Sequence, residues 1–205
     1  YEEAASQGLI AGINAARKLQ GKEGIVIDRS QGYIGVLIDD LVTKESHEPY
    51  RMMTSRAEYR LLLRQDNADM RLTKIGYEVG LIDEERYQKL LKKEEMIEKE
   101  IERVEHTNVG TTEAVQALLE SYESTPLTSG TTLAELIRRP ELSYEKIAPI
   151  DKHREELPYD VKEQVDINIK YDGYIKRQMR QVEQFKKLEN KRIPENINYD
   201  EIQSL

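Results

Sequence analysis

The sequence contains no cysteine and no tryptophan, and only one phenylalanine among its 205 residues. Without cysteine the chain forms no disulfide bond and performs no thiol catalysis, which fits a reducing compartment such as the cytoplasm. No apolar run approaches the roughly 18 residues that a membrane-spanning helix needs. We therefore expect a cytoplasmic protein without a membrane span. The chain opens on Tyr1, without an initiator methionine or a basic leader, and this start predicts a piece of a longer protein.

Motifs for metal and nucleophile chemistry are also missing. The three histidines, His47, His106 and His153, lie far apart and at no recognised ligand spacing. There is no GxSxG, HExxH or Walker-type loop, and no GxGxxG dinucleotide fingerprint. We expect no metal site and no catalytic residue within the chain, and no FAD or NAD held in the Rossmann manner by this chain alone.

What is present is a high charged fraction, 34%, beside 38% hydrophobic residues, a balance typical of helix-rich proteins with much exposed surface. The formal net charge is -8. Against this acidic background, residues 50–73 form a locally positive stretch, which we call the arginine segment. Its acids are Glu58, Asp66 and Asp69; its cations, with Lys74 just beyond the end, are Arg51, Arg56, Arg60, Arg64 and Arg71.

Arginine offers a planar fork of donors that binds phosphate or carboxylate at two points and stacks on flat rings. Tyr50 and Tyr59 lie among the arginines and could supply stacking faces. An anionic partner is therefore the first hypothesis, and ion pairing with carboxylates elsewhere in the chain is its alternative.

Two geometries are open for the arginine segment. If Ser55 caps a helix, Arg56, Arg60 and Arg64 fall on one helical face. If residues 60–64 form a strand, Arg60 and Arg64 share one face of it. Both geometries place at least two arginines side by side. The following residues 65–69 are rich in turn formers and predict a loop.

Residues 2–19 predict a helix, with acids in the first turn and basic residues in the last, as the helix dipole favours. Small residues recur on one face at Ala4, Gly8, Gly12 and Ala16. Since each glycine costs a helix about 1 kcal/mol relative to alanine, the stripe predicts close packing against another element. Exposed amides at the helix start could alternatively face an anionic cofactor group.

Residues 24–27 and 33–38 are short apolar runs joined by a turn-rich linker, and they read as β-like segments. Asp39 and Asp40 end the second run. Paired aspartates could bind a metal or act as acid and base. With no further ligand nearby, helix capping or a loop salt bridge is the better interpretation.

After Lys74 the pattern is helical throughout. A long amphipathic helix begins at Asp83 and extends to His106. Three shorter helices are predicted over residues 112–122, 133–139 and 143–147. A final helical run covers residues 161–190, where Gly173 is expected to break or bend it.

The final run carries a second basic patch beside Tyr171 and Tyr174. Basic residues mixed with aromatics favour a nucleic-acid surface, although a solvated charged helix is the commoner explanation for one run. The net charge of -8 argues for a localised site rather than general polyanion binding. The cations of the patch are Lys176, Arg177, Arg180, Lys186, Lys187, Lys191 and Arg192.

Several long motifs resemble the MnmG (GidA) flavoproteins, and the resemblance extends over essentially the whole chain. They are YEEAASQGLIAGINAA at residues 1–16, RSQ at 29–31, GVLIDDL at 35–41, EPYRM at 48–52, TSRAEYRL at 54–61, QDNAD at 65–69, RRPE at 138–141 and IKYDGYIKRQ at 169–178.

The resemblance implies a mainly α fold: a multi-helical C-terminal domain, residues 76–205, preceded by a small α+β remnant of an FAD-binding domain, residues 1–75. It implies a tRNA-modifying enzyme that uses FAD, NADH and a methylenetetrahydrofolate carbon. With the GTPase MnmE, such enzymes install a (carboxymethyl)aminomethyl group at C5 of the wobble uridine, and they form homodimers. The cofactor fingerprint and terminal helices of the family are expected to lie outside this chain.

The resemblance also suggests roles for residues. The first helix would lie near the flavin, so that Tyr1, Glu2, Glu3, Ala4 and Ala5 make peripheral FAD contacts. The chain alone is expected neither to hold flavin nor to turn over. Its alternative role is a helical protein-docking module with no nucleic-acid function, working through residues 83–106. The predicted tRNA-binding residues are Arg51, Arg56, Arg60, Arg64, Lys176, Arg177 and Arg180.

Overall fold

The computed structural model describes residues 1–45, 47–189 and 191–192, and within them the fold is mainly helical, as predicted. Two short strands pair antiparallel, with Asn108 opposite Thr132 and Val109 opposite Thr131. The elements are α1 (Glu2–Leu19), α2 (Tyr33–Thr43), η1 (Thr54–Arg56), α3 (Ala68–Glu78), α4 (Glu84–His106), β1 (Asn108–Val109), α5 (Glu113–Ser121), β2 (Thr131–Thr132), α6 (Leu133–Ile137), η2 (Ala148–Ile150) and α7 (Tyr159–Glu189).

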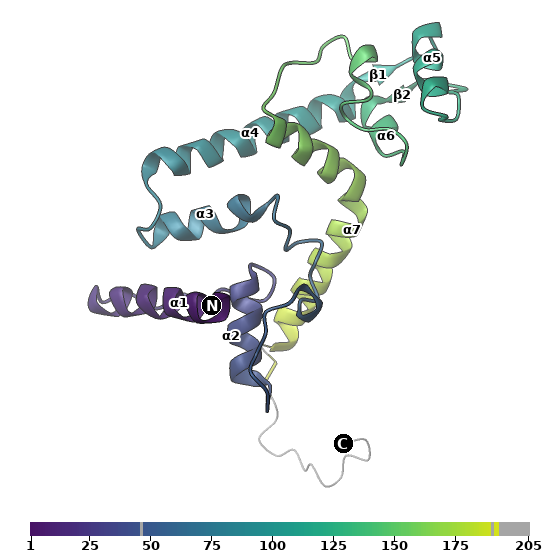
Figure 1. The fold of residues 1–205 in the computed structure, drawn as a ribbon. Coiled ribbons are helices and arrows are strands. Elements are labelled where there is room, and N and C mark those ends of the chain that lie inside the picture. Colours follow the sequence, from purple (N-terminus) through teal and green to yellow (C-terminus); the bar gives the residue numbers. More distant parts are fainter. Residues whose placement is uncertain (46, 190, 193–205) are drawn as a thin grey trace, which may run out of the picture.

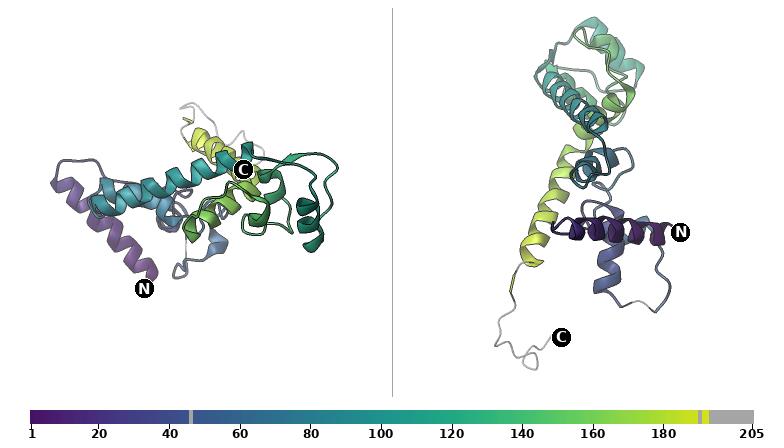
Figure 2. Two further views of the ribbon diagram at one scale, coloured as in Figure 1. Left: turned by 90° about the horizontal axis from the view of Figure 1, so that it is seen from above. Right: turned by 90° about the vertical axis from the view of Figure 1, so that its left-hand side faces the viewer.

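The long helix α7 joins the two ends of the molecule (Figure 1). Its first half packs with α4 and α6 in a helical body that also carries α5. Its second half runs down to the level of α2 and the arginine segment, with α1 lying across that end (Figure 2). The arginine segment and the second basic patch are therefore carried at the same end of the molecule.

The main hydrophobic core lies inside the helical body. It forms because α4, α5, α6 and the first half of α7 each turn an apolar stripe inward. Its fully buried side chains include Val104, Leu119, Leu133, Leu136, Ile137, Leu142, Ile147, Val161 and Val165. A much smaller cluster of Val36, Ala57 and Leu63 holds the arginine segment against α2.

The predicted helices after Asp83 are largely confirmed, and their starts follow capping chemistry. The side chains of Asp83, Thr112 and Thr132 accept hydrogen bonds from backbone amides of the first turns of α4, α5 and α6. The strands β1 and β2 were not predicted, because two-residue strands leave no alternating pattern to detect. Helix α3 begins at Ala68, so the predicted loop at residues 65–69 ends earlier than expected.

The predicted helix over residues 143–147 is wrong, since these residues form turns that lead into η2. A single helical-type bond closes the turn, from the Ile147 amide to the Ser143 carbonyl at 3.1 Å. The Tyr144 amide donates to the carboxylate of Asp166 in α7 at 2.7 Å. The Tyr144 hydroxyl donates to Glu100 at 2.6 Å, and Arg103 pairs with both Glu100 and Asp151 at 2.6 Å. Long-range polar contacts therefore set the backbone of this loop.

Helix α1 is confirmed over its full predicted length, but its predicted close packing is not seen. No residue of α1 is buried, and a Cβ added at Gly8 or Gly12 would meet no heavy atom within 4 Å among the described residues. The small-residue stripe therefore lies on an open face of the described part of the chain.

The prediction of β-like segments is wrong. Residues 33–38 belong to α2, whose glycine at position 35 lets the preceding loop lie directly on the helix: a Cβ there would lie 2.2 Å from the Asp28 carbonyl oxygen. Residues 24–27 form no strand, because the Asn14 side chain satisfies the backbone N–H and C=O of Ile25 at 2.7 and 3.0 Å. Tertiary contacts thus override the local β preference of both runs.

A break or a bend was expected at Gly173; the break is wrong, because α7 runs as one helix from Tyr159 to Glu189. The last residue of the predicted run, Asn190, lies outside the described residues.

Candidate nucleic-acid interface

The arginine segment adopts neither the helix capped by Ser55 nor the strand over residues 60–64 that the sequence left open. It runs extended into η1, then turns at Tyr59, whose carbonyl accepts from the amides of Leu62 and Leu63 at 3.0 Å. Ala57, Tyr59 and Leu63 are buried. Between η1 and α3 the segment is fixed by these apolar anchors rather than by a repeating secondary structure, and the neighbouring Arg56 and Arg60 are exposed.

Three of its arginines are exposed: Arg51, Arg56 and Arg60. The Arg56 guanidinium lies over the Tyr50 ring, 4.3 Å from its centroid, and its Nε donates to the Arg51 carbonyl at 2.9 Å. Arg60 has no hydrogen bond or ion pair with any residue that the structure describes. These three cations keep donors available to an anionic partner.

The other two arginines have internal partners. Arg64 pairs with Asp66 at 3.0 Å and also donates to the Leu61 carbonyl. Arg71 donates to the Arg64 carbonyl and to the Asn67 side chain, both at 2.9 Å. Burial, followed by the nearby charge of Arg64, lowers the pKa of Arg71. Arg64, one of the predicted tRNA-binding residues, would have to exchange its pairing with Asp66 to bind a phosphate.

Arg29 connects the arginine segment to α2 by hydrogen bonds and ion pairs. From the sequence, this residue was assigned only to a turn-rich linker. Its guanidinium donates to both oxygens of Glu58, at 2.7 and 2.8 Å, and to Asp39 at 2.9 Å. It also pairs with the buried Asp40 and donates to the Arg56 carbonyl at 3.2 Å. Hydrogen bonding to Glu58, the largest effect, raises the pKa of Arg29 despite partial burial. This confirms the salt-bridge interpretation of Asp39 and Asp40, although both lie within a helix.

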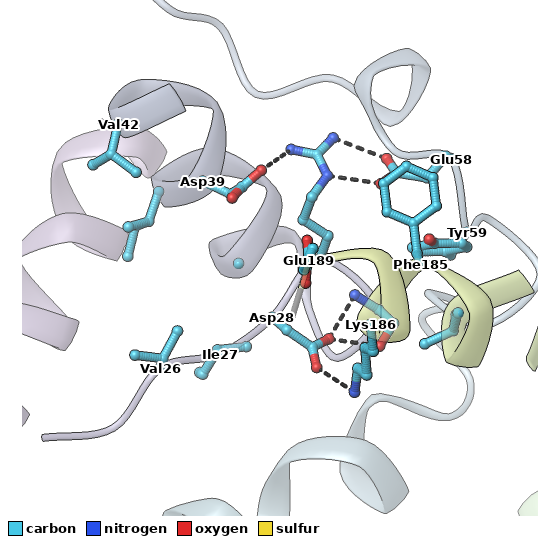
Figure 3. A pocket seen from close by; sticks show the side chains of 15 residues that line it. Val26, Ile27, Asp28, Asp39, Val42, Glu58, Tyr59, Phe185, Lys186 and Glu189 are labelled. Carbon is cyan, nitrogen blue, oxygen red and sulfur yellow. Dashed lines mark hydrogen bonds and ion pairs between the residues drawn. The ribbon is translucent and has the colours of Figure 1, made fainter. Parts of the chain in front are cut away.

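Figure 3 shows this arrangement from close by, with Asp39 and Glu58 reaching the same guanidinium from two elements. Beside it lies a cavity of about 240 Å³. Phe185 and Lys186 of α7 form one wall, and Lys186 pairs with Asp28 at 2.7 Å. The loop that carries Arg29 is thus held by both α2 and α7.

Gln178 of α7 forms a second set of hydrogen bonds with the arginine segment. Its side-chain oxygen accepts from the Leu62 amide at 3.2 Å, and its nitrogen donates to the Glu58 carbonyl at 3.3 Å. The exposed cations Lys176, Arg177 and Arg180 flank Gln178. The structure therefore brings the two predicted basic patches together, although they are far apart in sequence.

Within the α7 patch the three predicted residues differ in their surroundings. Lys176 pairs with Asp172 at 2.8 Å, and the Arg180 Nε donates to the Lys176 carbonyl at 3.3 Å. Arg177 has no ion pair with any described residue. Of the three predicted residues, Arg177 is consequently the one whose donors are most available for a partner.

The predicted cofactor-contacting residues, Tyr1, Glu2, Glu3, Ala4 and Ala5, form the start of α1. Glu3 accepts from the Met52 amide at 2.8 Å, and this bond is the largest effect lowering the pKa of Glu3. The start of α1 is thus tied to the arginine segment. These residues form one largely exposed helix turn with two carboxylates, Glu2 and Glu3, which repel the phosphates of a flavin dinucleotide, so this turn alone does not fit the whole cofactor.

No group of histidine, cysteine, aspartate or glutamate side chains among the described residues could hold a metal ion. No described helix is long and apolar enough to cross a membrane.

Ionisation of the Asp40 carboxyl group makes the stability of this part of the fold depend on pH in the acid range. Burial opposes its ionisation, but hydrogen bonds from Lys44, Tyr50 and Arg29 outweigh burial and lower its pKa from 3.8 to about 2. Because the pKa of Asp40 is lower in the folded chain than in the unfolded chain, its ionised carboxylate stabilises the fold at pH values above the unfolded-state pKa of 3.8. This stabilisation is lost as the pH falls towards 2. By linkage the contribution is about 2 kcal/mol.

We expect Asp40→Asn to remove this part of the acid sensitivity. The variant should unfold more easily at neutral pH and show a flatter stability profile between pH 4 and 2, measured by urea unfolding at each pH. Identical profiles for the variant and the original chain would contradict this role of Asp40.

The structure defines a class of protein: a helical domain joined to a segment that presents arginines beside tyrosine rings. Comparison with known proteins gives the family. Residues 84–179 match the model described as the tRNA modifying enzyme MnmG/GidA C-terminal helical domain, and residues 1–23 match glucose inhibited division protein A. The chain belongs to the MnmG/GidA family, as its motifs suggested.

Individual relatives agree. The chain is 68% identical to the tRNA uridine 5-carboxymethylaminomethyl modification enzyme MnmG of Lachnoclostridium phytofermentans and 62% identical to that of Caldicellulosiruptor saccharolyticus, over all of this chain and 33% of each relative. It superposes on Aquifex aeolicus GidA with a TM-score of 0.80 and 41% identity, over 100% of this chain and 32% of that one. The chain thus spans about a third of the length of these relatives.

Proposed function

We propose that this chain is the tRNA- and partner-binding part of an FAD-dependent enzyme that modifies C5 of the wobble uridine. The enzyme would use NADH as reductant, act as a homodimer in the cytoplasm and work with the GTPase MnmE. The relatives named as tRNA uridine modification enzymes support the reaction class. The boundary near residue 75 between a flavin-domain remnant and a helical domain belongs to the same proposal.

One observation carries the proposal. Arg51, Arg56 and Arg60 are exposed on a single segment that is fastened from two sides, by Arg29 and by Gln178. Guanidinium groups held on a fixed backbone bind phosphates with little loss of conformational entropy. The net charge of the whole chain is -8, which favours binding of a polyanion at this locally positive region over binding elsewhere on the surface.

Binding of an unmodified tRNA transcript to the purified chain tests the proposal. We expect a saturable complex in a filter-binding or fluorescence-anisotropy assay. A chain that binds no tRNA but binds the GTPase would instead be the helical docking module, with α4 as its surface. The exposed face of α4 does not favour that alternative, because ion pairs such as Lys89–Glu85 and Lys99–Glu95 cover it, as on an ordinary solvated helix.

The purified chain is expected to carry no flavin. Residues 1–5 present one helix turn with two carboxylates, which cannot enclose a dinucleotide. An absorbance spectrum of the purified chain, taken after incubation with excess FAD and gel filtration, should show no flavin band. A stoichiometric flavin band would contradict this part of the account.

A further inference from the structure

A hollow of about 580 Å³ lies between α6 and the middle of α7. Its lining joins charged side chains with one tyrosine and one glycine. The lining residues are Glu135, Arg138, Ile169, Lys170, Asp172, Gly173, Tyr174 and Arg177.

No contact within the described part of the chain requires a glycine at the hollow. Gly173 lies inside α7, a helix of 31 residues, and its φ is not among the positive values of the chain. A Cβ built on it would meet no heavy atom of the described residues within 4 Å. Alanine would therefore fit at this position and favour the helix more. What glycine provides is open space on the helix surface beside Tyr174.

The tyrosine of the hollow is exposed. Tyr174 keeps 60% of its surface accessible, and its neighbour Tyr171 keeps 45%. The two rings lie 6.4 Å apart and are tilted by 56°. The Tyr174 hydroxyl has no hydrogen bond to any residue that the structure describes. An open aromatic face next to an empty hollow is the arrangement that accepts a stacked ring.

The charge of the hollow favours an anionic group. Its two carboxylates are already paired, Glu135 with Arg138 and Asp172 with Lys176. Arg177, one turn beyond Gly173, has no such pair with any described residue. The next residue, Gln178, is bonded to the arginine segment. Along α7, the hollow therefore ends one residue before the contact with the arginine segment.

We propose that the hollow between α6 and α7 binds one unstacked nucleotide of the RNA. The base stacks on Tyr174 in the space that Gly173 leaves open, and Arg177 binds the adjacent phosphate. Proteins recognise RNA mainly through unpaired bases that stack on aromatic side chains, because the grooves of paired RNA expose little of the bases. This inference rests on the proposed tRNA binding and adds a requirement for an unpaired nucleotide.

The test uses four single substitutions, at three positions of the 205-residue chain. Gly173→Ala is expected to raise the melting temperature, because alanine favours the helix, and to weaken binding of a tRNA transcript about tenfold, because the methyl group fills the stacking space. Tyr174→Ala is expected to weaken binding by a similar factor, whereas Tyr174→Phe keeps the ring and should bind nearly as the original chain does. Gly12→Ala, at an equally open glycine of α1, is the matched control: a higher melting temperature with unchanged binding.

A fully paired, blunt-ended RNA duplex without a loop is the comparison probe, and its weaker binding should not change in any of these variants. Unchanged tRNA affinity in both Gly173→Ala and Tyr174→Ala would overturn the nucleotide site while leaving the proposed tRNA binding intact. Equal weakening for tRNA and the paired duplex would also overturn it, because the hollow would then contact only the RNA backbone. Failure of the original chain to bind tRNA would overturn the proposed function, and this inference with it.

Discussion

Charge reversal at Arg51 and Arg60 together is expected to weaken tRNA binding by about 100-fold. Both side chains are exposed, so the substitutions remove two phosphate contacts and place two carboxylates against the RNA backbone. The slope of log affinity against log salt concentration should fall in magnitude by about two, because two fewer counterions are released. Fluorescence anisotropy with labelled tRNA across a salt series measures both quantities.

Charge reversal at Lys89 and Lys99 of α4 is the matched control, since it changes the net charge by the same amount on an exposed helix face. The control should bind tRNA within a few-fold of the original chain. If both double variants lose the same affinity, the effect belongs to net charge and not to the arginine segment.

Replacing Arg29 with methionine is expected to destabilise the packing of the arginine segment on α2 by about 3–5 kcal/mol. The substitution leaves the carboxylates of Asp39, Asp40 and Glu58 without their shared cation, and Asp40 is only 2% exposed. The lost stability should appear as faster amide hydrogen exchange in α2, because the helix would open more often. The double variant with Glu58→Gln should lose less than the sum of the two single variants, because the two side chains interact directly.

The control for this prediction is Arg86→Met, at an exposed arginine of α4. A surface change of this kind stays within about 0.5 kcal/mol. A loss below about 1 kcal/mol for Arg29→Met would mean that the cluster of Val36, Ala57 and Leu63 alone holds the segment on α2.

Local patterns in the sequence predicted the long helices well. The apolar spacing after Asp83 and the acidic start and basic end of α1 depend on neighbours within one or two helical turns. The run at residues 33–38 could not be assigned in this way, because its apolar residues suit a strand or a buried helix equally. The contact that accompanies the helix, the Asp28 carbonyl lying on Gly35, is tertiary.

In the candidate site, too, features that depend on neighbours in sequence were predicted and features that depend on tertiary contacts were not. The clustering of cations in residues 50–73 and along α7 was visible in the sequence, and their chemistry suggested an anionic partner. Arg29 binds the arginine segment to α2, and Gln178 brings the two basic patches together. Both roles were missed because the partners lie far away along the chain: Arg29 and Glu58 are 29 residues apart, and Gln178 and Leu62 are 116 apart. The three-carboxylate surroundings of Arg29 exist only in the folded chain.

The salt dependence of tRNA binding by the unsubstituted chain tests the central claim most directly. With three to five phosphate contacts from the arginine segment and α7, log affinity should fall linearly with log salt concentration, with a slope between about -2 and -4. Absence of a complex at low salt, or an affinity that does not change with salt, would contradict the claim that these arginines form a tRNA-binding surface.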